Sequence, residues 1–245
     1  RSGFRLFQSS DSNSVTSNTA TGNDGSGIGV VTSSDNDVMS NNASENSKNG
    51  IDLFSSSDGN DVIANNATGN DIDGIRLFQS SDNDVVSNNA NGNVQDGLEI
   101  ELSSDGNNLT ANTATGNGNH GISIPGSSDN NVTTNIATEN VIDGIRLASS
   151  INNSVTANNA SANGDNGILL TLSGRSGPSV GNNLTDNMAN DNTRNGGWVE
   201  VGNGNVLTDN AADDNGENGI YLGGGISAQA DGNILVNNTA ISNGG

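Results

Sequence analysis

Apolar residues recur at fixed positions throughout the 245-residue chain, and Asn, Ser, Asp and Gly fill the intervals between them. The repeating unit is 23 or 24 residues long and is stretched twice. In each unit an apolar residue lies three positions before a central Asn, and an Ala lies two positions after it. A segment that opens with Gly and alternates apolar and polar residues completes the unit, as in Gly74-Ile75-Arg76-Leu77. This alternation at period two predicts a short strand.

The central Asn of each unit has one Asn five residues before it and another five residues after it. A helical repeat would place apolar residues three and four apart and would contain far less Asn and Gly. Asn and Gly instead tolerate the left-handed backbone conformation that a turning chain needs. The pattern predicts a coil that closes once per unit. The ten central residues are Asn18, Asn41, Asn65, Asn88, Asn112, Asn135, Asn158, Asn187, Asn210 and Asn238.

If one unit forms one coil, equivalent residues stack about 4.8 Å apart, as neighbouring strands do. Each side-chain amide then bonds its copies in the coils above and below, and the apolar positions face inward as a core. We expect one all-β domain over residues 1–245, a parallel β-helix (β-solenoid) of about ten coils with Asn ladders at its turns. The coils begin near Gly3, Gly27, Gly50, Gly74, Gly97, Gly121, Gly144, Gly167, Gly196 and Gly219.

Segments such as GIRLFQSSDNDVVSNNANGN and GISIPGSSDNNVTTNIATEN resemble the parallel β-helix proteins of the pectate-lyase-like superfamily, especially its NosD-like branch. The resemblance covers all ten units and implies a right-handed coil, which the periodicity alone does not establish. That superfamily includes polysaccharide lyases and hydrolases, adhesins, phage tailspikes and surface-layer proteins, so the scaffold does not determine an activity. The NosD-like resemblance also implies copper delivery. His120, Met39 and Met188 fall in different coils, however, and we expect no shared copper site.

The composition excludes several classes of protein. The chain has no Cys, which removes disulfide scaffolds, zinc knuckles and thiol nucleophiles. It carries 28 Asp and Glu against 7 Lys and Arg, a formal net charge of -21. Nucleic acid is not an expected partner, because binding phosphates requires clustered cations. No apolar run approaches the length of a membrane span, so we expect no membrane insertion.

The polar position between the two apolar residues of each strand should form one outward row along the rod. Asp52, Arg76 and Glu99 alternate in sign there and predict a charge ladder. Glu99 and Glu101 face the same way, about 6–7 Å apart along a strand, and beside Arg76 they are the candidate residues for cleaving a glycosidic bond. The lyases of the superfamily generally use more basic residues to neutralise a uronate, and we expect no catalytic centre. The row reads Arg5, Gly29, Asp52, Arg76, Glu99, Ser123, Arg146, Leu169, Trp198 and Tyr221.

The last three members of this row, Leu169, Trp198 and Tyr221, include the only Trp and the only Tyr. The two stretched connections lie beside them, and the first contains Arg175. Aromatic residues next to protruding loops predict a patch that stacks on sugars or binds a partner. Shielding of the C-terminal end is the alternative interpretation.

A second polar feature is the sequence Ser-Ser-Asp, which recurs in the first six units. Like charges stacked at strand spacing repel each other. The carboxylates therefore either splay into solvent or hold a cation, for which hard oxygen ligands favour Ca²⁺ or, in brine, monovalent ions. The residues of this candidate metal row are Asp11, Asp35, Asp58, Asp82, Asp105 and Asp129.

The sequence thus predicts a non-catalytic structural or interaction module of a secreted or cell-surface protein. The acidic surplus and single Lys favour a salt-loving source, because salt screens the repulsion. Natural solenoids cover their open edges, so we expect part of a longer chain, or a subunit that stacks end to end in a filament or surface layer. Other surface proteins or glycans are further partners. The alternatives are a polysaccharide lyase or glycoside hydrolase with an open charged groove, and a carbohydrate-binding adhesin or tailspike.

Overall fold

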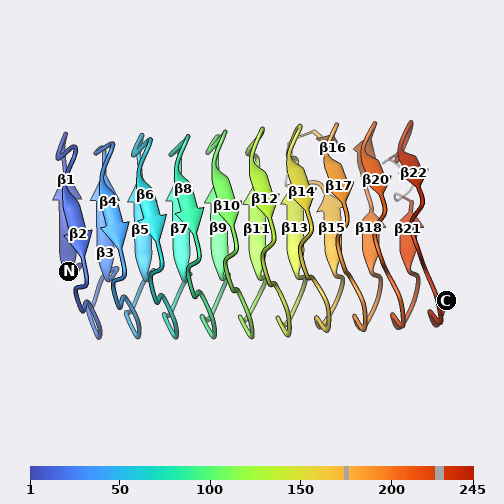
Figure 1. Cartoon of the computed structure of the whole chain (residues 1–245), viewed down its shortest axis with the longest axis horizontal. Helices are drawn as coiled ribbons and strands as arrows, with labels where there is room; N and C mark the ends of the chain where they lie inside the picture. The colour runs from blue at the N-terminus through green and yellow to red at the C-terminus, as the bar shows by residue number, and fades with distance from the viewer. Residues whose placement is uncertain (174–176, 224–228) are drawn as a thin grey trace.

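The computed structural model describes residues 1–173, 177–223 and 229–245. Within these residues all regular elements are β-strands. The same residues contain no helix with the length and apolar character needed to cross a membrane. The chain forms a rod of stacked coils with its two termini at opposite ends (Figure 1). Each coil adds one strand to each of two parallel sheets. The predicted right-handed parallel β-helix is confirmed.

The segments that open with Gly form the ten-stranded sheet A. Its strands are β1 (Phe4–Phe7), β3 (Ile28–Val31), β5 (Ile51–Phe54), β7 (Ile75–Phe78), β9 (Leu98–Glu101), β11 (Ile122–Pro125), β13 (Ile145–Ala148), β15 (Ile168–Thr171), β18 (Gly197–Val199) and β21 (Ile220–Leu222).

The segments between the first and central Asn of each unit form the ten-stranded sheet B. A third side of the coil has isolated bridges, and two further strands, β16 (Ser179–Val180) and β19 (Gly202–Asn203), pair near the first stretched connection. The strands of sheet B are β2 (Ser14–Thr16), β4 (Asp37–Met39), β6 (Asp61–Ile63), β8 (Asp84–Val86), β10 (Asn108–Thr110), β12 (Asn131–Thr133), β14 (Ser154–Thr156), β17 (Asn183–Thr185), β20 (Val206–Thr208) and β22 (Ile234–Val236).

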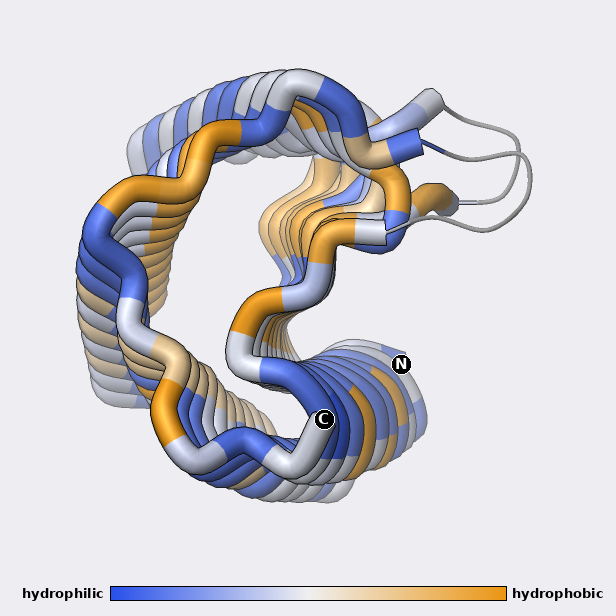
Figure 2. Tube along the Cα trace, turned by 90° about the vertical axis from the view of Figure 1, so that its right-hand side faces the viewer, coloured by the Kyte–Doolittle hydropathy of each residue, from blue (hydrophilic) through white to orange (hydrophobic). Residues whose placement is uncertain are grey.

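Equivalent residues lie over one another from coil to coil. Ile51 pairs with Ile28 on one side and with Ile75 on the other. Successive coils superimpose closely in the view down the rod (Figure 2). The inward Ile, Leu and Val columns form one core together with the Ala column, which fills the tight corner beside the coil-opening Gly. Burial of these columns supplies the main favourable term in folding.

The predicted Asn columns form three buried ladders. Asn65 donates its Nδ2 to Oδ1 of Asn88 at 3.0 Å, and its backbone N–H donates to the same oxygen at 2.9 Å. The other N–H of Asn65 Nδ2 donates to the Val38 carbonyl oxygen at 2.8 Å. The Asn65 Oδ1 accepts two hydrogen bonds from Asn41. The side chain therefore uses its full hydrogen-bonding capacity without water.

The residue before each ladder Asn takes the left-handed conformation that aims the Asn inward. The φ angle is 54° at Ala64, before Asn65, and 65° at Gly69, before Asn70. The positive φ thus falls one residue before each ladder Asn and not at the Asn itself. The turn needs a small or polar residue at that position, which Ser, Ala, Asp and Gly provide in different coils.

Strand β18 departs from the core pattern at Gly197. This residue lies over Ile168 on one side and Ile220 on the other, at a position where the other coils carry Phe, Ile or Leu. The missing side chain leaves a small void whose lining includes Ile168, Leu207 and Ile220. The core is thus locally underpacked near its C-terminal end.

Gly197→Ala should raise the free energy of unfolding by about 1 kcal/mol, because the methyl group fills part of this void and restricts the unfolded chain. The new Cβ would lie 3.7 Å from Ile220 Cγ1, an ordinary contact. The matched change Gly74→Ala should instead cost about 2 kcal/mol or more, because its Cβ would lie 2.7 Å from the Gly97 carbonyl oxygen. Chemical denaturation measures the free energy of unfolding of both variants. If both were stabilised, or both destabilised, the packing described would be contradicted.

Candidate functional site

The outer face of sheet A carries the row of charged and aromatic residues that the sequence predicts. Arg5 pairs with Gly29, Arg76 pairs with Glu99, and Trp198 pairs with Tyr221, each in direct register. The remaining members are joined in the same way. The ten residues therefore lie in one file along the rod.

Arg76 is the centre of an ion-pair cluster on this face. Its Nε lies 2.8 Å from Glu101 Oε1 and 3.9 Å from Glu99 Oε2, and its Nη1 lies 3.7 Å from Asp52 Oδ1. The guanidinium also lies over the Phe78 ring, 4.7 Å from its centroid. The structure thus brings together the sequence-predicted residues Arg76, Glu99 and Glu101, with the shortest ion pair between Arg76 and Glu101.

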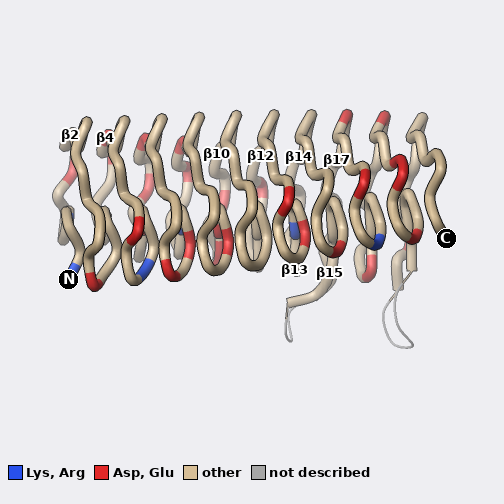
Figure 3. The backbone as a smooth tube through the Cα atoms, turned by 90° about the horizontal axis from the view of Figure 1, so that it is seen from below, with Lys and Arg blue, Asp and Glu red and all other residues tan. Residues whose placement is uncertain are grey.

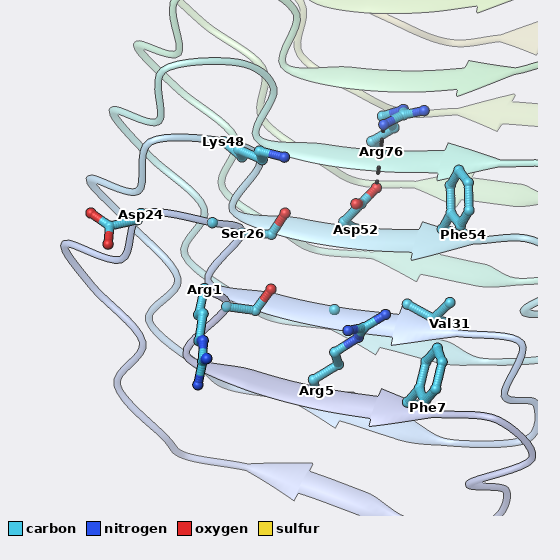
Figure 4. A pocket seen from close by; sticks show the side chains of 13 residues that line it. Arg1, Arg5, Phe7, Asp24, Ser26, Val31, Lys48, Asp52, Phe54 and Arg76 are labelled. Atoms are coloured by element: carbon cyan, nitrogen blue, oxygen red, sulfur yellow. Dashed lines mark ion pairs between the residues drawn. The ribbon is translucent and has the colours of Figure 1, made fainter.

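The N-terminal part of the same face is hollowed into a groove of about 930 Å³ (Figure 4). It spans the first four strands of sheet A, and three strand spacings are about 14 Å. Four of the chain's seven Lys and Arg residues line it. The charged and aromatic lining residues are Arg1, Arg5, Phe7, Asp24, Lys48, Asp52, Phe54 and Arg76.

Gly29 keeps the floor of the groove open. It occupies the outward row between Arg5 and Asp52, where any other residue would project a side chain into the hollow. A Cβ at this position would have Ser2 Oγ as its nearest neighbour at 3.7 Å, so the backbone itself tolerates a larger residue. Sequence reasoning missed the groove, although Gly29 in an otherwise filled row was its visible signal.

A fourth ladder, which the sequence did not reveal, runs through the residues before the coil-opening Gly from Asn49 to Asn218. Asn218 donates its Nδ2 to Asn195 Oδ1 at 2.9 Å, and Asn195 donates to Asn166 Oδ1 at 3.0 Å. These bonds point toward the N-terminal end of the rod, whereas the other three ladders donate toward the C-terminal end. Four consecutive rungs of this ladder are not Asn: they are Asp73, Asp96, His120 and Asp143.

Three carboxylates meet where this fourth ladder lies beside the outward row. Asp73 is 1% exposed and Asp96 is 6% exposed, and the Asp96 backbone N–H donates to Asp73 Oδ1 at 3.0 Å. Glu99 approaches them from β9, and one oxygen from each residue lies within 4.8 Å of the others. Among the described residues, none donates a hydrogen bond to Asp73 Oδ2. We call these three residues the acidic cluster.

Burial raises the pKa of each carboxyl group in the acidic cluster. Burial raises the pKa of Asp73 to about 7. Burial, followed by the charge of Asp73, raises the pKa of Glu99 to about 9. Burial also raises the pKa of Asp96, against the lowering effect of His120. The cluster therefore retains protons at a pH where ordinary carboxyl groups have lost them.

The Ser-Ser-Asp residues do not form the single column that the sequence suggests. The alternation of 23 and 24 residues shifts every second copy by one position, so the carboxylates of each column are two coils, about 9.6 Å, apart. Asp58 Oδ1 accepts a hydrogen bond from the Ser81 backbone N–H at 2.7 Å. This register removes the like-charge stacking that suggested a cation in this row. One column contains Asp11, Asp58 and Asp105, and the other contains Asp35, Asp82 and Asp129.

The aromatic row at the other end of sheet A has the predicted arrangement. Trp198 and Tyr221 meet edge to face with their ring centroids 6.1 Å apart, and Leu169 is their neighbour in the row. Arg194, which the sequence analysis did not single out, lies 4.8 Å above the Trp198 ring. It borders a hollow of about 230 Å³ with both aromatic residues. The fourth predicted member of this patch, Arg175, lies outside the described residues.

A family profile described as periplasmic copper-binding protein (NosD) matches residues 65–244, and another described as right handed beta helix region matches residues 1–90. The chain belongs to the NosD family. A comparison with curated protein sequences gave no significant match.

Several solved structures share the NosD chain's fold. The periplasmic alginate epimerase AlgG has a TM-score of 0.68 at 17% identity, over 88% of this chain and 61% of that one. The A-module of the Azotobacter vinelandii mannuronan C-5 epimerase AlgE4 has a TM-score of 0.62 at 14% identity, over 97% of this chain and 75% of that one. Pectate lyase Pel9A has a TM-score of 0.56 at 16% identity, over 88% of this chain and 62% of that one. At these identities the likeness shows the fold alone.

The residues of this NosD chain do not fit a copper site. Its soft and imidazole ligands are His120, Met39 and Met188. His120 Nδ1 lies 3.2 Å from Asp143 Oδ2 at the edge of sheet A, Met39 is in β4 of sheet B, and Met188 is on the third side, two coils beyond His120. Two coil spacings are about 9.6 Å, several times the length of a metal-ligand bond, so His120 and Met188 cannot bind the same ion. Copper therefore enters no step of the function derived below.

Raising the pH should destabilise the fold through the acidic cluster. The folded pKa values of Asp73 and Glu99 are raised, so their contribution is complete near pH 4 and is lost as the pH rises through about 7 and about 9. We expect the free energy of unfolding in chelator-treated buffer to fall by about 2 kcal/mol or more between about pH 5 and about pH 9.

Glu99→Gln is the control for this pH dependence, because the net charge of the chain contributes its own slope. The variant removes the carboxyl group whose pKa is raised most, while Asp96, Glu101 and Arg76 stay in place around it. Its unfolding free energy should depend less steeply on pH. Identical slopes in the wild type and the variant would contradict the assignment.

Proposed function

We propose that the protein is a non-catalytic interaction module outside the cytoplasm that binds an acidic polysaccharide in the groove of sheet A. The observation that carries this proposal is the gathering of four of the seven Lys and Arg residues around one groove in a chain of net charge -21. Acidic residues, in contrast, are spread along the length of the rod (Figure 3). The periplasmic description of the NosD family supports a location outside the cytoplasm.

Two cations of the groove, Arg5 and Lys48, are available to a ligand. Among the described residues, no carboxylate forms an ion pair with Arg5 or Lys48. Arg5 instead lies over the Phe7 ring, 4.3 Å from its centroid. A guanidinium that stacks on an aromatic ring keeps its N–H groups free for bidentate hydrogen bonds to a carboxylate. The groove therefore favours an anion over a neutral molecule.

The aromatic rings of the groove suit a sugar. Phe7 is 43% exposed, and Phe54 is partly exposed on the same side of the groove. A pyranose ring has an apolar face that packs against an aromatic ring, and a uronic acid adds the carboxylate that a guanidinium binds. The rings lie in β1 and β5, and the cations are distributed between β1 and β7, which matches a repeating chain rather than a single small molecule.

An open charged groove is also what a polysaccharide lyase or hydrolase would have, but the ion pairs of Arg76 favour binding over catalysis. In the described part of the chain, Arg76 is the only cation that pairs with Glu99 and Glu101. It is held by Glu101 at 2.8 Å and also lies near Asp52. Its charge is offset by the protein's own carboxylates before a uronate arrives. A polysaccharide lyase or hydrolase on the same scaffold is the alternative, and it would require the chain to shorten the polymer.

Arg5→Gln should weaken binding of polygalacturonate about tenfold or more, because one charge-assisted pair is lost. Gly29→Leu should also abolish binding by filling the groove, since a side chain fits at this position without disturbing the backbone. Arg146→Gln is the matched control, because it removes the same charge from the same row outside the groove. Affinity electrophoresis measures each variant, with neutral dextran as the control polymer.

Binding of dextran as tight as that of polygalacturonate would overturn the proposal, as would equal losses in the Arg5 and Arg146 variants. The same mixtures, followed for new reducing ends and for unsaturated products, decide between binding and cleavage. We expect the length of the polymer to stay unchanged.

A further inference from the structure

Asp73 is a residue that the fold alone does not explain. Its rung in the fourth ladder is Asn in other coils, for example Asn49 and Asn166. An Asn there would donate its Nδ2 to Asn49 Oδ1, as Asn195 does to Asn166. Asp73 can make no such donation when ionised, and within the described chain its Oδ2 has no hydrogen-bond donor. A buried, ionised carboxylate oxygen without a partner destabilises the fold, so Asp73 needs either a retained proton or a cation at this oxygen.

Across the residues that the structure describes, no cationic side chain forms a close ion pair with Asp73. Arg76 makes its closest ion pair with Glu101 at 2.8 Å and is 3.9 Å from Glu99. The His120 side chain lies against Asp143 at 3.2 Å, and only its backbone N–H donates to Asp96. Three carboxylates of the acidic cluster therefore converge on one point without a cationic side chain between them.

The spacing of the acidic cluster accommodates a Ca²⁺ ion. The three oxygens of the cluster lie within 4.8 Å of one another. Two oxygens bound to one Ca²⁺ are at most about 5 Å apart, since each bond is about 2.3–2.6 Å long, so three oxygens at this spacing can share one ion. The ligand set contains only oxygen, which favours a hard cation over copper.

We propose that Asp73, Asp96 and Glu99 form a Ca²⁺ site at the edge of sheet A. Asp73 and Asp96 provide the buried ligands from two successive rungs of the fourth ladder. Glu99 closes the site from the outward row, and its side chain is 21% exposed, which leaves a path for the ion and for water ligands. Ca²⁺ takes six to eight oxygens, so carboxylates that bind through one or two oxygens, together with water, complete its shell.

Titration calorimetry with CaCl₂ alone, on the full chain without polysaccharide, tests the site. We expect one Ca²⁺ per chain. Asp73→Asn should weaken binding about 100-fold or more. Loss of a direct metal ligand lowers the affinity at least as much as loss of a residue that hydrogen-bonds to a ligand. The variant should fold, since Asn occupies the same rung in other coils.

Asp61→Asn is the matched control. Asp61 lies in β6 on sheet B, directly between Asp37 and Asp84, so the variant removes the same charge from another group of carboxylates. It should leave Ca²⁺ binding unchanged. Absence of saturable binding by the wild type would overturn the proposal. Equal losses in the Asp73 and Asp61 variants would overturn it too, because they would show that Ca²⁺ merely screens the acidic surface.

Thermal unfolding gives a second test, because Asp73→Asn should raise the melting temperature without Ca²⁺ and abolish its increase with Ca²⁺. Without Ca²⁺, Asp73→Asn should melt at a higher temperature than the wild type, because the amide restores the rung. With Ca²⁺, the melting temperature of the wild type should rise and that of the variant should stay constant. A variant that still responds to Ca²⁺ would contradict the assignment. Loss of polygalacturonate binding in the Arg5 variant is measured separately, so the failure of either proposal leaves the other testable.

Discussion

The stacking of each coil on the next in fixed register is the constraint on which the whole structure depends. A buried side-chain amide is tolerated only when all of its hydrogen bonds are made. Asn65 meets this condition through Asn41, Asn88 and a carbonyl of the preceding coil. A slip of one residue would break the ladders and turn the apolar columns outward at the same time. This shared dependence explains how a chain with 30% hydrophobic residues forms a unique fold.

The most unusual chemistry lies where this rule is broken. The fourth ladder replaces its amides with Asp73, Asp96, His120 and Asp143 in four successive coils, and the first two meet Glu99 below the surface. Consistency between sequence and fold is expected everywhere except at positions that serve another purpose. The cationic groove begins at the next strands toward the N-terminus, so two oppositely charged features adjoin each other on one face.

The sequence predicts the features that repeat and misses those that depend on single residues. The Asn columns, the inward core and the outward row follow from spacing alone, and the pairing of Arg76 with Glu99 confirms the row. The fourth ladder escapes notice because its rungs change from Asn to Asp to His, which leaves no constant residue to find. The Ser-Ser-Asp column fails for a related reason: one additional residue in alternate coils shifts the carboxylates. The groove depends on a missing side chain at Gly29, which a search for conspicuous residues overlooks.

Because each coil contacts only its two neighbours, the order of chemical groups along the rod repeats their order along the chain. Removing or duplicating one unit between the groove and the aromatic end would change their separation by one step of about 4.8 Å and leave both intact. The spacing between two surface features is thus a quantity that recombination between repeats can alter in whole steps. A rod built in this way can change the distance between its surface features without redesigning its core.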